Sequence, residues 1–312
     1  MRLDYAQNAG IITKLHNTIM NKASSFFRYP GGKSKLKNRI VCKLSEISSD
    51  NTLEYREPFF GGGSIGLSVF EKRQKLDKIW INDFDLGISS LWTTLINRPD
   101  LLKLLVQKFE PSVRMFDKYK EELTDTPLPK LTSDTEIANF GFAKLAIHQI
   151  SYSGLGTKSG GPLGGRNQKS NYKIDCRWSP KYICKKIDAL HQRFSKLSVR
   201  NNICTNLDFS DVIDDTTHAA IIYLDPPYFE KGNDLYQHGF AEKDHIRLVD
   251  CLKRTKHQWL LSYDDCPEIR KYYDWANIEE ISEVNYSITA TKDKKTGERK
   301  STSKLELLIS PK

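Results

Sequence analysis

The chain has 312 residues, of which 28% are charged and 38% hydrophobic, as expected for a globular protein with one large domain or a core domain carrying an insertion. No apolar run approaches 18 residues, which argues against a transmembrane helix, and residues 1–21 lack the apolar core of a signal peptide. The six cysteines form no CxxC pair, so we expect a cytoplasmic protein with no metal site and no disulfide framework.

The first half of the chain predicts a β-turn-α-β unit after a weakly ordered lead-in at residues 1–25. The unit consists of a strand at 52–57, a helix at 64–75 and a strand at 78–82. The elements predicted next are helices at 86–109 and 112–123, a proline-containing loop at 124–132, and a helix at 134–149.

Residues 153–165 contain six glycines and one proline, a composition that excludes a helix or a regular strand. The elements predicted after this segment are a helix at 181–197, strands at 203–205, 219–224 and 258–262, and a hairpin that pairs 282–289 with 304–309 around a basic tip.

We therefore predict an α/β core formed by residues 26–91 and 199–312, with residues 92–198 inserted into it. The net charge of +9 is concentrated in the insertion, where residues 158–200 hold eleven Lys or Arg and only two acids. Aromatic residues are interleaved with these cations, which is typical of a nucleic-acid-binding surface, although a solvated lysine-rich surface has the same composition.

Asp225-Pro226-Pro227-Tyr228 directly follows the apolar run 219–224, which predicts a buried parallel strand. Ligands of open α/β sheets bind outside the carboxyl ends of such strands. Asp225 offers a carboxylate to accept a hydrogen bond from an amine, Pro226 adds a carbonyl acceptor, and Pro227 stiffens the turn. Tyr228 offers an aromatic face for a base. The alternative interpretation is a simple strand-ending turn.

The turn after the first strand, Glu57-Pro58-Phe59-Phe60-Gly61-Gly62-Gly63-Ser64-Ile65-Gly66, contains a GxGxxG pattern. Asp83 lies 22 residues after Gly61, at the end of the second strand, where a carboxylate can bind ribose hydroxyls. The pattern is compatible with a dinucleotide or with a plain tight turn. Glu57 favours S-adenosylmethionine instead, because it offers a carboxylate to a cationic amino-acid group.

The segment Phe26-Phe27-Arg28-Tyr29-Pro30-Gly31-Gly32-Lys33-Ser34 resembles the end of a phosphate-binding loop. The first glycine of that motif would fall at Phe27, so a nucleoside-triphosphate site fails on spacing. Lys33, on the turn that includes Gly32, is instead predicted to pair with the ligand's carboxylate. Tyr29 is predicted to cover an apolar portion or the sulfonium group of the ligand.

Taken in order, these motifs resemble the Dam-like family of DNA adenine-N6 methyltransferases. The resemblance covers residues 26–33, 57–66, 81–83, 225–228 and 260–270, and the closing hairpin at 286–288 and 305–309. In the insertion only residues 152–155 match, and loosely. Tyr29 stands where Trp is common in the family. The long glycine-rich segment leaves the target sequence open.

The resemblance implies a Rossmann-like methyltransferase fold with a mixed, mostly parallel sheet and an inserted target-recognition domain. It also implies a bacterial or phage enzyme that uses S-adenosylmethionine and no metal. We expect it to act as a monomer on double-stranded DNA, with or without a separately acting restriction endonuclease. The predicted cofactor-binding residues are Tyr29, Gly32, Lys33, Glu57, Pro58, Phe59, Gly61, Gly63, Ser64, Asp83, Asp208, Phe209 and Asp225. Phe209 has core packing as its alternative role.

The predicted mechanism places a flipped-out adenine on Tyr228, with its amine donating hydrogen bonds to Asp225 and to the Pro226 carbonyl. Phosphate contacts are expected mainly from cations in or near the glycine-rich segment. The predicted DNA-binding residues are Arg28, Lys158, Arg166, Lys169, Lys173 and Arg177. The remaining alternatives are methylation of cytosine N4, of RNA or of a protein amide, and a non-catalytic DNA-binding regulator.

Overall fold

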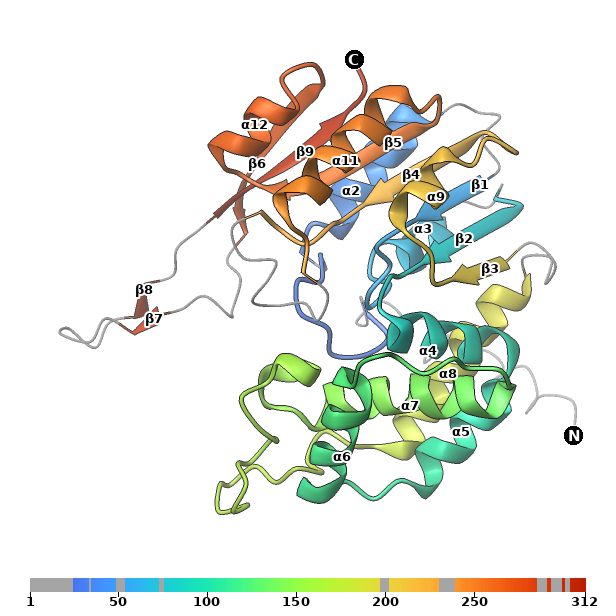
Figure 1. Cartoon of the computed structure of the whole chain (residues 1–312), viewed down its shortest axis with the longest axis vertical. Coiled ribbons are helices and arrows are strands. Elements are labelled where there is room, and N and C mark those ends of the chain that lie inside the picture. The colour runs from blue at the N-terminus through green and yellow to red at the C-terminus, as the bar shows by residue number, and fades with distance from the viewer. Residues whose placement is uncertain are drawn as a thin grey trace, which may run out of the picture.

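The computed structural model describes residues 25–33, 35–48, 54–72, 76–196, 202–229, 239–284, 291–292, 299–300 and 304–312. Its centre is a seven-stranded sheet of order β3-β2-β1-β4-β5-β9-β6 (Figure 1). The strands are β1 (Glu54–Glu57), β2 (Lys78–Asn82), β3 (Asn202–Thr205), β4 (Ala220–Leu224), β5 (Gln258–Asp264), β6 (Asn277–Val284) and β9 (Lys304–Ser310). A separate two-stranded ribbon pairs β7 (Thr291–Lys292) with β8 (Arg299–Lys300).

The five strands from β3 to β5 are parallel, whereas β9 runs antiparallel to both β5 and β6. This mixed, mostly parallel sheet confirms the predicted α/β, Rossmann-like fold class. The predicted pairing of 304–309 with the preceding strand is also confirmed, but β6 begins at Asn277, five residues before the predicted start. Residues 285–290 of the predicted hairpin lie outside the described residues.

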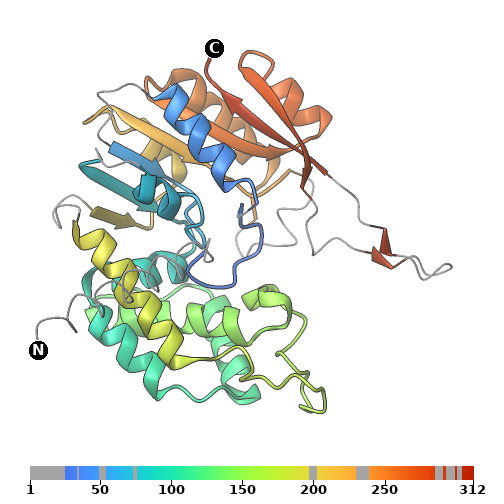
Figure 2. The same ribbon diagram turned by 180° about the vertical axis from the view of Figure 1, so that it is seen from behind.

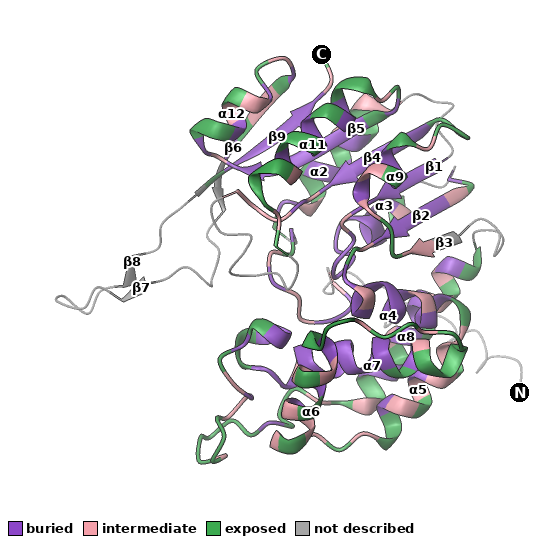
Figure 3. Cartoon of the chain, in the orientation of Figure 1, coloured by how far each residue is buried: buried purple, intermediate pink, exposed green. Residues whose placement is uncertain are grey.

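Helices cover both faces of the sheet (Figures 1 and 2). The helices of the chain are α2 (Lys37–Ile47), α3 (Gly66–Lys72), α4 (Leu86–Asn97), α5 (Pro99–Lys108), α6 (Val113–Thr124), α7 (Asp134–Ile150), α8 (Pro180–Lys196), α9 (Phe209–Asp214), α11 (Glu242–Arg254) and α12 (Pro267–Tyr272). Alternate residues of β4 point to opposite faces. Tyr223 joins the core that includes α2 and α3, and Ile222 joins the core that includes α9, α11 and α12. Both faces of the sheet are therefore buried, as Figure 3 shows.

Helices α4 to α8 lie together beyond the β3 edge of the sheet (Figures 1 and 2). Their core is continuous with the α2 and α3 side of the sheet. None of the helices in the described ranges has the length and apolar character needed to cross a bilayer. The glycine-rich segment between α7 and α8 forms only two three-residue 3-10 turns, η1 (Tyr152–Gly154) and η2 (Gly156–Lys158), as its composition predicted.

Two features of the helices differ from the sequence prediction. The helix predicted at 86–109 is two helices, because Arg98 leaves the helical region at φ −135° and ψ 56° and Pro99 begins α5. A proline lacks the N–H that would continue the preceding helix, but it fits the first turn of the next. The sequence analysis also assigned no helix to α2, α9, α11 or α12.

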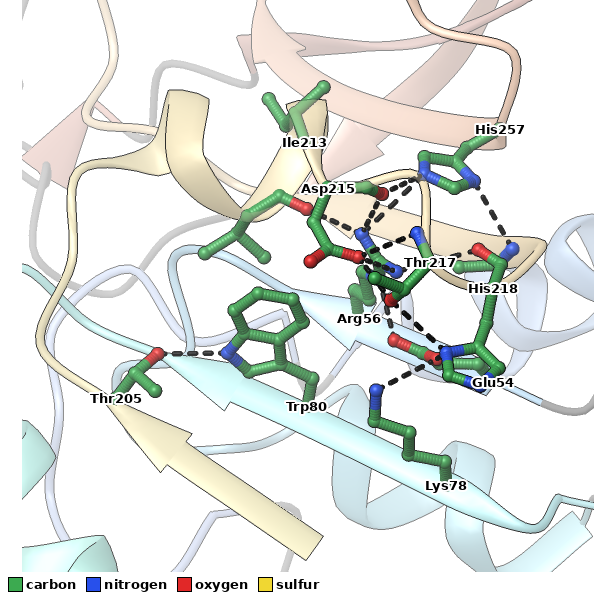
Figure 4. A network of polar contacts seen from close by, with 12 residues as sticks. Glu54, Arg56, Lys78, Trp80, Thr205, Ile213, Asp215, Thr217, His218 and His257 are labelled. Carbon is green, nitrogen blue, oxygen red and sulfur yellow. Dashed lines mark hydrogen bonds and ion pairs between the residues drawn. The ribbon is translucent and has the colours of Figure 1, made fainter. Parts of the chain in front are cut away.

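A buried polar network occupies the opposite end of the sheet from the motif residues (Figure 4). Arg56 is fully buried. It donates to Glu54 at 2.6 Å and to Asp215 at 3.0 Å, and its guanidinium lies 4.9 Å from the Trp80 ring. It also donates to the carbonyls of Val212 and Asp215, at 2.8 and 2.6 Å. This arginine joins β1 to the segment that leads into β4.

We predict that Arg56→Met lowers the free energy of unfolding by about 3–5 kcal/mol, because it leaves the buried Glu54 carboxylate without its strongest partner. Chemical denaturation measures the change. Arg254→Met is the matched control, because Arg254 pairs with Asp214 at the surface, where an ion pair contributes about 1 kcal/mol or less. Equal denaturation midpoints for the two variants would show that the network does not stabilise the core.

Candidate active site

The carboxyl ends of β1, β2 and β4 surround a cavity of about 330 Å³. It brings together most of the predicted site. The predicted residues that line it are Tyr29, Gly32, Glu57, Pro58, Phe59, Gly61, Ser64, Asp83, Asp208, Phe209, Asp225 and Pro227. Four other predicted residues are not part of its lining, namely Lys33, Gly63, Pro226 and Tyr228. The sequence analysis had not selected Phe240 and Arg247, which line the cavity from the region around α11.

The glycine turn after β1 is shaped by close contacts that exclude side chains. Gly61 and Gly63 have φ values of +49° and +72°, which glycine adopts at low cost. A Cβ atom at Gly61 would lie 2.6 Å from the Tyr29 ring, and one at Gly63 would lie 2.9 Å from both the Phe60 and Trp92 rings. Tyr29 is therefore packed directly against the turn, and Gly63 has a packing role outside the cavity.

Asp83 fixes the same turn from the end of β2. One carboxylate oxygen accepts from the Gly61 N–H at 2.8 Å, and the other accepts from the Asp85 N–H at 2.9 Å. Asp85 in turn forms a buried ion pair with Lys144 of α7. Burial and the nearby Asp85 charge raise the pKa of Asp83 to about 7. This carboxylate is thus a hydrogen-bond acceptor whose charge changes near neutral pH.

Glu57 is the second carboxylate on this side of the cavity, and it is almost fully buried. The Tyr55 hydroxyl donates to it at 2.6 Å, and a Cβ atom at Gly66 would lie 2.6 Å from the same oxygen. Burial raises the pKa of Glu57 well above its usual range. A cationic group entering the cavity would favour the ionised form of this carboxyl.

An aromatic cluster forms another wall of the cavity. The Phe59, Phe209 and Phe240 rings lie within 5.6 to 5.9 Å of one another, measured between centroids. The Arg247 guanidinium lies 4.9 Å from the Phe209 ring and donates to Asp208 at 2.7 Å. Phe209 both packs in the core and lines the cavity, so the two roles considered for it are compatible.

Asp225 lies just beyond the end of β4 with its side chain 17% exposed. The Lys33 ammonium donates to its Oδ1 at 2.6 Å, and the Ser262 hydroxyl donates to the same oxygen at 3.0 Å. Burial raises the pKa of Asp225, and Lys33 opposes that effect. Lys33 is turned toward Asp225 in this structure, so its contact with a cofactor carboxylate stays a prediction.

Tyr228 continues the motif beside Lys33, whose ammonium lies 4.5 Å from the ring centroid. The Tyr228 hydroxyl donates to Glu306 of β9. The sequence analysis missed Glu306 and Ser262 as site residues, because the resemblance covers their segments, 260–270 and 305–309, without assigning a role to either side chain. The one available signal was that both lie in segments the sequence placed in strands near the motif.

His148 of α7 is not part of the cavity lining and packs behind it. Its Nδ1 lies 2.8 Å from the Gly154 carbonyl, and its ring packs against Phe27 and Tyr29. Burial lowers its pKa to about 3, so the imidazole is neutral at physiological pH. The neutral ring packs against Tyr29 and helps to hold it in place.

The six predicted DNA-binding residues form two groups. Lys158, Arg166, Lys169, Lys173 and Arg177 are exposed along the segment between α7 and α8. Arg28 is half-buried and donates to the Ser151 carbonyl at 3.3 Å, where that segment begins. Arg166 pairs with Asp117 of α6 at 2.9 Å, and Lys173 donates to the Gln168 carbonyl. Cations therefore line the exposed segment, and Arg28 joins it to the cavity side.

Comparison with known proteins identifies the family. The sequence model of the D12 class N6 adenine-specific DNA methyltransferases matches residues 29–287, a range that includes Tyr29, the glycine turn and the Asp225 motif. No curated protein matches the chain. Among solved structures, the rRNA methyltransferase aviRa from Streptomyces viridochromogenes is similar at a TM-score of 0.38 and 12% identity, over 90% of this chain and 86% of that chain. The family assignment rests on the sequence model, and the chain belongs to the D12 class N6 adenine-specific DNA methyltransferase family.

Proposed function

We propose that this adenine-specific DNA methyltransferase takes its methyl group from S-adenosylmethionine bound in the cavity at the carboxyl ends of β1, β2 and β4. The target is an adenine flipped out of duplex DNA onto Asp225–Tyr228. The observation that supports the proposal most directly is that the glycine turn, Asp83, the aromatic wall and Asp225 all line the same cavity.

The residues of the cavity fit that cofactor. The cavity volume lies within the range typical of small-molecule sites. The glycine turn permits close approach of a ligand, Asp83 can accept from ribose hydroxyls, and the Phe59 and Phe209 rings can hold a purine. Glu57 offers its carboxyl to the cationic amino group. When bound, the cofactor supplies an electrophilic methyl group on a sulfonium.

The adenine amine is conjugated with its ring, so its lone pair is a weak nucleophile. Asp225 and the Pro226 carbonyl can accept its two N–H groups, which favours a tetrahedral nitrogen whose lone pair points at the methyl group. Both acceptors interact more strongly as positive charge develops on nitrogen, which stabilises the transition state more than the ground state. The Tyr228 ring offers the stacking surface for the flipped base.

The family assignment favours adenine in DNA over cytosine N4, RNA or a protein amide. The same assignment supports an enzyme over a non-catalytic regulator. We also propose that the enzyme acts as a cytoplasmic monomer, and that any cognate restriction endonuclease acts separately.

We predict that Asp225→Ala lowers the rate of methyl transfer by at least about 100-fold while leaving DNA binding intact, because it removes a preorganised acceptor. Labelled methyl transfer to unmethylated duplex DNA, followed by nucleoside analysis, measures both the rate and the methylated base. Asp214→Ala, at a surface carboxylate that ends α9, is the control and keeps normal turnover. Full turnover in Asp225→Ala would rule out the mechanism, and N4-methylcytosine as the product would rule out the target.

We predict that S-adenosylhomocysteine binds more weakly as the pH falls through about 7, because protonation of Asp83 removes an acceptor for ribose hydroxyls. Isothermal calorimetry between about pH 6 and about pH 8 measures this dependence. Asp83→Asn should bind weakly at every pH and lose that part of the dependence. If Asp83→Asn kept the wild-type affinity and pH dependence, Asp83 would have no part in ligand binding.

We predict that Arg166→Ala and Lys169→Ala each weaken duplex DNA binding and reduce the slope of log affinity against log salt by about one. The exposed ion pair between Arg166 and Asp117 does not prevent Arg166 from contacting DNA, because such a pair contributes little to stability. Fluorescence anisotropy over a salt series measures the slope. Lys253→Ala, an exposed cation on α11, is the control. If all three variants kept the wild-type slope, DNA would have to bind elsewhere.

A further inference from the structure

Glu306 is a buried carboxylate for which the proposed mechanism has no role. It is 1% exposed, whereas the preceding Leu305 is 39% exposed, so β9 turns an acid inward and a leucine outward. The strand places Glu306 opposite Asp264 of β5 and Ile281 of β6. Burying a carboxylate costs several kcal/mol unless hydrogen bonds and an opposite charge compensate it. Its partners therefore explain why it is there.

Both of its described partners belong to the methyl-transfer site. The Tyr228 hydroxyl donates to Oε1 of Glu306, and the Lys33 ammonium lies 3.4 Å from the same oxygen. Lys33 in turn lies 2.6 Å from Asp225 and 4.5 Å from the centre of the Tyr228 ring. One ammonium is thus held between two carboxylates and beside the aromatic ring.

One carboxylate would be sufficient to neutralise Lys33, so the second needs a different explanation. Glu306 is anchored in the sheet, whereas Asp225 and Tyr228 lie on the turn that follows β4. A carboxylate fixed in the sheet gives the Tyr228 hydroxyl a fixed acceptor and thereby sets the plane of the ring. It also lies 3.4 Å from the ammonium that Asp225 contacts at 2.6 Å, so the Lys33 charge is shared between two carboxylates and Asp225 is more able to accept from a further donor.

We propose that Glu306 is a positioning residue for methyl transfer, which fixes the Tyr228 ring and holds the Lys33 ammonium between itself and Asp225. The proposal rests on the proposed function, because it takes Asp225 as the amine acceptor and Tyr228 as the stacking surface. Its alternative is a purely structural ion pair that stabilises the sheet and leaves the chemistry unaffected.

The two roles differ in their effect on kcat through the position of Tyr228, whereas the charge of Glu306 acts on the ionisation of Asp225 in either role. The charged and titratable groups around Asp225, from every element packed against it, are Lys33, Glu57, Tyr223, Tyr263 and Glu306. The Glu306 charge raises the pKa of Asp225, and the Lys33 charge lowers it. Removing the Glu306 charge therefore lowers the pKa of Asp225, and removing the Lys33 charge raises it.

The test compares Glu306→Gln, Glu306→Ala and Lys33→Met with the wild type. We expect the Asp225 carboxyl, followed by carbon-13 NMR and assigned with Asp225→Asn, to titrate at lower pH in Glu306→Gln and at higher pH in Lys33→Met. The acid limb of the pH profile of kcat should move in the same directions. Glu306→Ala should lower kcat by about tenfold to 100-fold through misplacement of Tyr228. Glutamine should recover most of that loss, because its amide oxygen still accepts from the tyrosine hydroxyl.

Two further variants complete the comparison. Tyr228→Phe removes the hydroxyl and keeps the ring, so Glu306→Ala should lower kcat much less in that background than in the wild type. Glu279→Gln makes the same chemical change on the neighbouring strand β6, where the glutamate pairs with Arg39 and Lys43, and should alter neither the titration nor kcat.

An unchanged Asp225 titration in Glu306→Gln, or equal loss of kcat in the glutamine and alanine variants, would overturn the proposal. If Glu306→Ala fails to fold, the glutamine variant still decides, because it preserves the shape and the acceptor. If the wild type transfers no methyl group to adenine, the proposed function fails, and the NMR titration still shows whether Glu306 acts on Asp225.

Discussion

The site depends on the ion pair between Lys33 and Asp225, which joins residues 192 positions apart in the chain at a distance of 2.6 Å. Lys33 is 2% exposed, and such a cation is stable only beside an anion. Burial raises the pKa of Asp225, and the charge of that cation opposes the effect. The segment that precedes α2 is thereby held to the end of β4, and Tyr29 is held against the glycine turn. One contact thus joins two distant segments of the site and favours the ionised form of its acceptor.

The helices beyond β3 support the same site. Trp92 of α4 donates to the Gly61 carbonyl at 2.9 Å, and Lys144 of α7 pairs with Asp85, whose N–H donates to Asp83. Lys186 of α8 donates to the carbonyls of Ser25 and Phe26, at 2.8 and 2.6 Å. Helices that we expect to read DNA therefore also hold the glycine turn and the segment before Tyr29.

The sequence predicted most of the sheet and the parts of the site that consist of motifs. Asp225 was predictable because a short buried strand ends there, and Asp83 because the glycine pattern fixes its spacing. Glu306 was not predictable, because a glutamate between two leucines in a strand normally faces solvent. Only the pairing of β9 between β5 and β6 turns it toward Lys33. The contact between Lys33 and Asp225 was also missed, because no local pattern specifies a contact between residues 192 positions apart.

The distribution of charge around Asp225 has a consequence for the reaction. Asp225, Glu306 and Lys33 together carry a net charge of −1 when both carboxyls are ionised, and Ser262 donates to the Asp225 oxygen that Lys33 already contacts. In the proposed mechanism, positive charge that develops on the amine beside Asp225 meets this excess of negative charge. A neutral site with Lys33 and Asp225 alone would lack this excess. The charge of Glu306 is costly to bury for the same electrostatic reason, and the hydrogen bond from Tyr228 offsets part of that cost.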